Sequence, residues 1–172
     1  MEDNRSKKFV FIPFCLICQA FQAKGIVKYE WSSSIKPIIS LLIEKDYNIV
    51  QMPCPESTFK GYAEGLSRKP KGYNYYNNPD FKNVCSDAVM EVIKKIKGIL
   101  NNGYEISAIF GIEMSPSCAV NYQYTNKGMI NKPGLFIEML QNSLKEERIN
   151  IKFIGINRRH INPALKEISL LK

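Results

Sequence analysis

The segment ISAIFGIEMSPSC, residues 106–118, begins as an apolar run and ends in serine, proline and cysteine. The run ISAIFGI shows no alternation of polar and apolar residues, which is typical of a strand covered on both faces, as in a parallel sheet. A turn from such a strand into a helix ordinarily uses Gly, Asp or Asn. The polar ending SPSC is therefore the first clue to function.

Three other short runs have the same apolar character and also predict buried strands. They are Lys8–Phe14, Tyr47–Met52 and Ile151–Ile156. Helices are predicted between the strands, from Ser34 as a cap to about Lys45, from Asn78 and Pro79 to Asn102, from Pro133 to about Glu147 and from Pro163 to Leu171.

Strands that alternate with helices predict an α/β protein. We expect a single domain over residues 1–172, with a three-layer Rossmann-like fold and a mostly parallel sheet of four to five strands. The Gly-, Lys- and Tyr-rich stretch 57–78 is predicted to be an inserted loop or lid, with some helix around Phe59–Leu66.

Three cysteines stand at the ends of predicted strands. Cys15 ends the first run, Cys54 follows the second and Cys118 follows the third. The carboxyl ends of parallel strands share one edge of a sheet, where ligands bind. Three thiolates there suit a soft metal or an iron–sulfur cluster. The alternative is that they are small buried residues, since free cysteine is commonly buried.

The other two cysteines have different settings. Cys85 belongs to the apolar stripe of the long predicted helix, so we assign it to the core. Cys18 forms a CxxC pair with Cys15 where a strand meets a helix, which is the pattern of a dithiol redox pair. The redox pair is the alternative, and we expect Cys18 to be a packing residue or a residue that supports the site without binding metal.

Polar residues accompany the thiols. Glu56 follows Cys54 in CPE, and Ser115 and Ser117 precede Cys118 in SPSC. A carboxylate and hydroxyls beside a metal can activate water or relay protons, although helix capping and a solvated carboxylate explain them too. Asn157 and Arg158 follow the fourth strand, and we expect them to meet a carbonyl or phosphate of a substrate.

The chain carries 24 Lys and Arg against 16 Asp and Glu, for a net charge of +8. This charge suits an anionic partner such as a nucleotide phosphate or RNA, or only solvated helix faces. The basic stretch 67–76 supplies Arg68 and Tyr73 as candidate contacts to a base, if it is not an ordinary exposed loop. No run approaches the ~20 apolar residues that cross a bilayer, and the polar start predicts a cytoplasmic protein with reduced cysteines.

The segments FCLIC, PCPE and SPSC, in this order and each behind a strand, resemble the thiouracil desulfidase (TudS-like) family. Gly65, Leu66, Arg68 and Pro70 extend the resemblance after CPE. The resemblance implies a [4Fe-4S] cluster held by Cys15, Cys54 and Cys118, with the fourth iron left open. It further implies that this iron binds the sulfur of a thiocarbonyl compound, and that water replaces the sulfur without net electron transfer and releases sulfide.

In such an enzyme Glu56 would be the general acid and base, and Ser115 and Ser117 would hold the substrate or water. The substrate would be a thiolated pyrimidine or related thiocarbonyl, as a free base, a nucleotide or a thiolated base in RNA. Phe14 before the first cysteine and Ala119 after SPSC depart from the family pattern and indicate a divergent branch.

Two other functions fit the same residues. The first is a non-enzymatic metal-binding or redox-sensing module, in which a fourth ligand such as Cys18 closes the site. The second is a dithiol oxidoreductase that uses Cys15 and Cys18 and binds no metal. The sequence does not give an oligomeric state.

Overall fold

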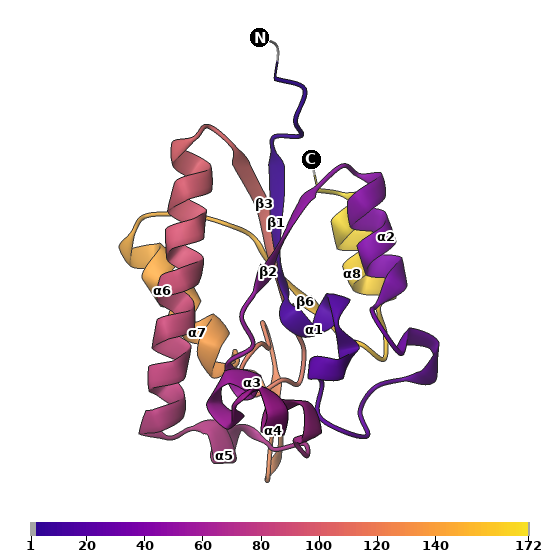
Figure 1. The fold of residues 1–172 in the computed structure, drawn as a ribbon, viewed down its shortest axis with the longest axis vertical. Helices are drawn as coiled ribbons and strands as arrows, with labels where there is room; N and C mark the ends of the chain where they lie inside the picture. Colours follow the sequence, from indigo (N-terminus) through magenta and orange to yellow (C-terminus); the bar gives the residue numbers. More distant parts are fainter. Residues whose placement is uncertain (1–2, 172) are drawn as a thin grey trace.

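A computed structural model of the chain describes residues 3–171. Its centre is a sheet of four parallel strands in the order β2-β1-β3-β6. Figure 1 labels these strands between the flanking helices. The strands are β1 (Lys8–Pro13), β2 (Asn48–Met52), β3 (Glu105–Ile112) and β6 (Phe153–Ile156). The predicted α/β fold with a mostly parallel sheet is therefore confirmed.

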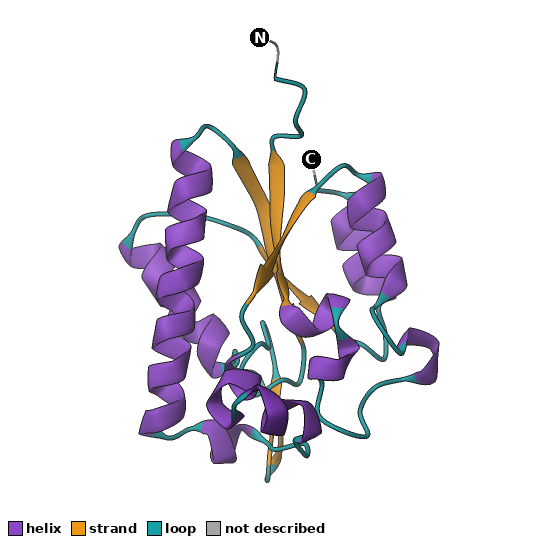
Figure 2. Cartoon of the chain, in the orientation of Figure 1, coloured by secondary structure: helices purple, strands orange, loops and turns teal. Residues whose placement is uncertain are grey.

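Two pairs of helices enclose the sheet and form the outer layers of a three-layer structure (Figure 2). The helices on one face are α2 (Lys36–Glu44) and α8 (Asn162–Ser169), and those on the other are α6 (Pro79–Asn101) and α7 (Leu135–Glu146). In the part of the chain that is described, no helix is long and apolar enough to cross a membrane.

Successive residues of the central strands pack into two separate hydrophobic cores, one on each face of the sheet. Phe11 and Ile109 pack with α6 and α7, whereas Val10 and Phe110 pack with α2 and α8. All four side chains are fully buried. Because side chains alternate across a strand, covering both faces requires apolar residues at consecutive positions, which explains the continuous apolar runs.

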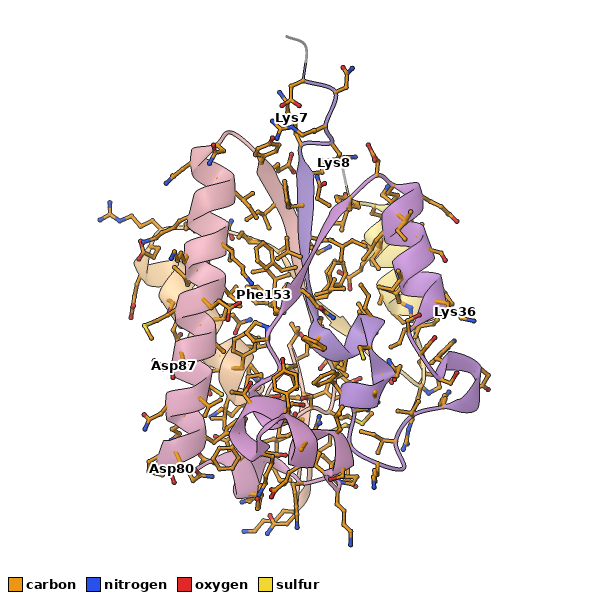
Figure 3. The ribbon with its side chains drawn as sticks, viewed as in Figure 1. Lys7, Lys8, Lys36, Asp80, Asp87 and Phe153 are labelled. Atoms are coloured by element: carbon orange, nitrogen blue, oxygen red, sulfur yellow. The ribbon has the colours of Figure 1, made fainter. Side chains whose placement is uncertain are left out.

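The strand order contains a reversal between β1 and β3. The chain passes from β1 to β2 on one side, and then returns to place β3 on the other side of β1. In open α/β sheets, ligands bind outside the carboxyl ends of the strands at such a reversal. In Figure 3, Lys7 and Lys8 mark the amino edge of the sheet, and Asp80 lies at the opposite end of the molecule, on the side of the carboxyl edge of the sheet.

Short elements gather at the carboxyl edge. They are the helices α1 (Phe14–Ile17), α3 (Pro55–Lys60), α4 (Tyr62–Ser67) and α5 (Tyr73–Tyr76), the 3-10 turns η1 (Gln19–Phe21) and η2 (Tyr29–Trp31), and a hairpin of β4 (Gln123–Thr125) and β5 (Gly128–Ile130). The stretch 57–78 thus folds largely as short helices rather than as an open loop. The hairpin was not predicted.

One predicted helix start is confirmed and another is wrong. Asn78 caps α6, because its side chain accepts a hydrogen bond from the Phe81 N–H at 2.9 Å. Ser34 does not cap α2, which begins at Lys36 without a side-chain cap. A cap at Ser34 would put Pro37 at the third helical position, and proline has no N–H to donate to it.

Candidate functional site

Cys15, Cys54 and Cys118 stand at the carboxyl edge of the sheet. Cys15 lies in α1 directly after β1, Cys54 precedes α3 after β2, and Cys118 ends the loop after β3. Cys118 is buried, and the other two are half-buried. Because β1 and β3 flank the reversal in strand order, Cys15 and Cys118 lie on its two sides. The expected grouping at one edge is what the fold produces.

The three thiols influence one another electrostatically. Burial first, and then the neighbouring Cys54, raise the pKa of Cys15 to about 12. Burial also raises the pKa of Cys118, as do Cys54 and Cys15. The pKa of Cys54 is raised by burial first and then by Glu56. The thiols therefore stay protonated in the metal-free protein unless cationic charge enters between them.

The spacing of these groups is not that of a site for a single ion. Among residues 3–171, no three side chains of His, Cys, Asp or Glu are placed to hold one metal ion. The thiols are near enough to raise one another's pKa and yet do not converge on one point. Their common location at the sheet edge follows from the backbone topology.

Glu56 accepts hydrogen bonds from both serine hydroxyls of the loop after β3. Its Oε1 accepts hydrogen bonds from Ser117 Oγ at 2.7 Å and from Ser115 Oγ at 3.2 Å. Ser117 Oγ is also 3.4 Å from Cys118 Sγ. The structure thus brings the three residues predicted to be catalytic into one network that ends at a thiol.

The loop that carries the serines is held in a fixed shape. Ser115 Oγ accepts hydrogen bonds from the backbone N–H groups of Ser117 at 3.3 Å and Cys118 at 3.0 Å. Two glycines press against its backbone, since a Cβ on Gly111 would lie 2.2 Å from the Cys118 carbonyl oxygen and one on Gly134 would lie 2.4 Å from the Ser117 carbonyl carbon. Only glycine permits this approach.

A buried carboxylate anchors the other side of the same loop. Glu113 is 2% exposed and accepts hydrogen bonds from Asn121 Nδ2 at 2.7 Å and from the backbone N–H groups of Asn121 and Tyr122. These donors offset the cost of burying the charge. The sequence reasoning missed Glu113, although an acidic residue directly after a buried strand is a signal that was available.

Arg68 uses its guanidinium within the protein. It pairs with Glu56 Oε2 at 3.4 Å and donates to Ser57 Oγ at 3.0 Å, to the Gly65 carbonyl at 2.9 Å and to the Phe21 carbonyl. Its side chain is only 7% exposed. The geometry supports a role in holding Glu56, whereas contact between Arg68 and substrate stays a prediction.

Three further residues predicted to contact substrate differ in whether their polar groups already have hydrogen-bond partners. Tyr73 is half-buried, and its hydroxyl accepts a hydrogen bond from Lys132 Nζ at 3.1 Å. Asn157 Nδ2 donates to the Tyr122 hydroxyl at 2.9 Å. Arg158 has a buried Nη1 without a hydrogen-bond partner in the described chain. The roles of all three in substrate binding stay predictions.

The other cysteines and the histidine lie outside the network. Cys85 is fully buried in α6, which confirms its place in the core. Cys18 is the half-buried C-cap of α1, and His160 is an exposed residue after β6. Gln19, which the sequence reasoning missed, is buried and donates from Nε2 to the Cys15 carbonyl at 2.7 Å.

Two open hollows lie away from the cysteines. One is lined by the end of α7 and Phe153, the first residue of β6, and the other by Phe9, Tyr104 and the end of α6. Both are at the amino edge of the sheet and contain no cysteine or histidine. The chemistry at the carboxyl edge, rather than the size of a hollow, identifies the candidate site.

Comparison with known proteins supports the fold. No family model matches the chain. An uncharacterized protein of Methanocaldococcus jannaschii is 22% identical over 126 residues, which are 73% of this chain and 74% of that protein. The solved structure of a [4Fe-4S]-dependent thiouracil desulfidase, TudS, is similar with a TM-score of 0.50 and 17% identity, over 95% of this chain and 96% of that chain. This likeness shows a shared fold.

Proposed function

We propose that this protein is a [4Fe-4S]-dependent desulfidase that removes sulfur from a thiolated pyrimidine or a related thiocarbonyl compound. The observation that carries the proposal is the network of Glu56, Ser115 and Ser117, which ends at Cys118 on the sheet edge shared with Cys15 and Cys54. The fold shared with a thiouracil desulfidase supports it.

The donor set fits an iron–sulfur cluster. Three soft sulfur donors, one buried and two half-buried, lie at one edge of the sheet, and burial raises the pKa of each thiol, so that cationic iron would have to displace its proton. Cys15, Cys54 and Cys118 would hold the cluster, and Cys18 is left out of the set. When bound, a cluster with one iron free of protein ligands supplies a Lewis acid with an affinity for sulfur.

The side chains of this protein would transfer the protons of the reaction. Replacement of a thiocarbonyl sulfur by water gives a carbonyl and hydrogen sulfide, with no change in the number of electrons. Glu56 would take a proton from the attacking water, and its hydrogen bonds from both serines and its ion pair with Arg68 support this role. General acid and base catalysis of this kind contributes about 10²–10⁴-fold to a rate.

Ser117 provides a path for that proton. Its hydroxyl has one proton, which it donates to Glu56 at 2.7 Å, and its oxygen lies 3.4 Å from Cys118 Sγ. Protonated Glu56 becomes the donor, which frees the Ser117 proton to point toward the sulfur side of the site. Ser115 orients this pair, because two backbone N–H groups fix its oxygen.

Cluster binding is tested under anaerobic conditions. Wild-type protein is reconstituted with iron and sulfide, and iron, labile sulfide and the visible spectrum are measured. We expect about four irons in each chain, loss of iron in Cys15→Ala, Cys54→Ala and Cys118→Ala, and retention in the matched controls Cys18→Ala and Cys85→Ala. Failure of the wild type to take up iron would overturn the proposal.

The same variants separate the two alternatives. A dithiol oxidoreductase predicts a metal-free protein whose activity needs Cys15 and Cys18, and a closed structural site predicts that Cys18→Ala loses metal along with the other three.

Turnover is then measured as uracil and sulfide released from thiouracil. We expect Glu56→Gln and Ser117→Ala to keep their iron and to lose about 10²-fold or more in rate. Thiolated nucleotides and thiolated RNA are tested next, and a rate that falls steeply as salt rises would identify RNA as the substrate. Full activity in Glu56→Gln would exclude the assigned proton path.

A further inference from the structure

Arg158 is half-buried, and one nitrogen of its guanidinium has no hydrogen-bond partner in the described part of the protein. Its Nη1 is buried and forms no hydrogen bond within residues 3–171. No ion pair to Arg158 is present among these residues, and Glu56 pairs instead with Arg68. A buried polar nitrogen without a partner is costly, and a hydrogen bond from a ligand would offset that cost.

Arg158 lies at the same sheet edge as the candidate site. Arg158 follows β6, which ends beside β3 at the carboxyl edge. Cys15 and Glu56 are its electrostatic neighbours, because both raise its pKa against the lowering effect of burial. Cys15 is fixed in turn by the hydrogen bond from Gln19 to its carbonyl. The charge therefore lies where a bound substrate would reach the thiols and the carboxylate.

The turn that carries Arg158 is already ordered. Asn157 donates from Nδ2 to the Tyr122 hydroxyl at 2.9 Å and accepts at Oδ1 from the Arg159 N–H at 2.9 Å. The His160 N–H closes the turn onto the Asn157 carbonyl at 3.0 Å. A fixed turn sets the backbone position of Arg158 before a ligand arrives, which lowers the entropic cost of binding.

We propose that Arg158 binds a negatively charged group of the substrate, so that the natural substrate is a thiolated ring bearing a carboxylate or a phosphate. This inference rests on the proposed function. The planar guanidinium matches both anions with two parallel hydrogen bonds. The net charge of +8 favours the approach of an anion.

Binding of sulfur-free analogues tests the proposal without any turnover. Uracil is compared with orotate, which adds a carboxylate to the ring, and with uridine 5′-monophosphate, which adds a phosphate. Dissociation constants are measured by calorimetry on reconstituted protein with wild type, Arg158→Gln and Arg158→Lys. Arg159→Gln is the matched control, because Arg159 is the exposed neighbour in the same turn. Iron is counted in every variant.

We expect wild type to bind orotate or uridine 5′-monophosphate at least tenfold more tightly than uracil, and the stronger of the two identifies the anion. Arg158→Gln should remove this preference, Arg158→Lys should keep part of it, and Arg159→Gln should leave it unchanged. Equal binding of all three analogues by wild type, including no binding, would overturn the inference. A preference that survives in Arg158→Gln, or iron lost from that variant alone, would also overturn it.

The result is separable from the proposed function. If the protein takes up no iron but the anion preference depends on Arg158, the anion site stands and the desulfidase proposal fails. If iron binds and thiouracil turns over while the analogues bind equally, the desulfidase stands and the anion site fails.

Discussion

Replacement of Arg68 by methionine is expected to weaken both the fold and the site. Methionine keeps much of the side-chain volume but makes none of the hydrogen bonds. The guanidinium makes three hydrogen bonds to neutral oxygens, of Ser57, Gly65 and Phe21, and a long ion pair of 3.4 Å with Glu56. At about 1 kcal/mol for each hydrogen bond and about 1 kcal/mol for the long ion pair, the expected loss is about 4 kcal/mol.

An independent argument gives a similar magnitude. Removing one partner of a buried pair typically costs about 3–5 kcal/mol, because the other charge stays buried without compensation. The Arg68 and Glu56 side chains are 7% and 12% exposed. A typical domain has about 5–15 kcal/mol of stability, so the substitution removes a large fraction of the total.

Urea unfolding of the metal-free protein under reducing, anaerobic conditions measures this loss. With an m-value of about 2 kcal/mol/M, the midpoint should fall by about 2 M. Lys69→Met, at the exposed neighbour, is the matched control and should change the free energy of unfolding by less than about 0.5 kcal/mol. The double variant with Glu56→Gln should lose less than the sum of the single losses. A loss below about 1 kcal/mol, or simple additivity, would refute the assigned contact.

Three further outcomes follow from the same structure. Gly134→Ala should destabilise the protein by about 3 kcal/mol or more, because its Cβ would meet the backbone at Ser117, and normal stability in calorimetry would contradict that packing. Asn78→Ala should cost about 1 kcal/mol of stability through loss of the cap of α6, measured as a lower Tm. Asn77→Ala is the control, because Asn77 does not cap the helix. The pKa of Cys15 is raised from 9.0 to about 12, so its contribution to the stability of the metal-free protein is complete below pH 9 and is lost as the pH rises toward 12. The free energy of unfolding should therefore fall more steeply above pH 9 in wild type than in Cys15→Ala, and parallel curves would be inconsistent with a buried thiol.

The central sheet was predictable because its signal is local. Strands β1, β2, β3 and β6 are continuous apolar runs, and burial on both faces requires such runs. Parallel pairing then places their carboxyl ends at one edge, which is why Cys15 and Cys118 were expected to be near each other. The hairpin of β4 and β5 escaped prediction because strands of three residues carry too short a pattern to distinguish.

The candidate site was predictable in composition but not in its contacts. Glu56 and Ser117 are 61 positions apart, and only the packing of α3 against the loop after β3 brings their oxygens to 2.7 Å. Arg68 reaches Glu56 because Gly61, with φ of 73°, turns the chain sharply between α3 and α4. The buried pair of Glu113 and Asn121 likewise depends on where a loop returns. Such contacts depend on tertiary structure, and no periodic pattern of residues in the sequence indicates them.

The three edge cysteines come from three successive strand ends, and this fixes the order of events in biosynthesis. Cys15 and Cys54 leave the ribosome long before Cys118, which reaches its place only after β3 has paired with β1. A nascent chain therefore presents incomplete sets of sulfur donors until the middle of the sheet has formed. In a protein that binds the proposed cluster, metallation would follow folding, and the metal-free form would have to stay folded until iron is supplied.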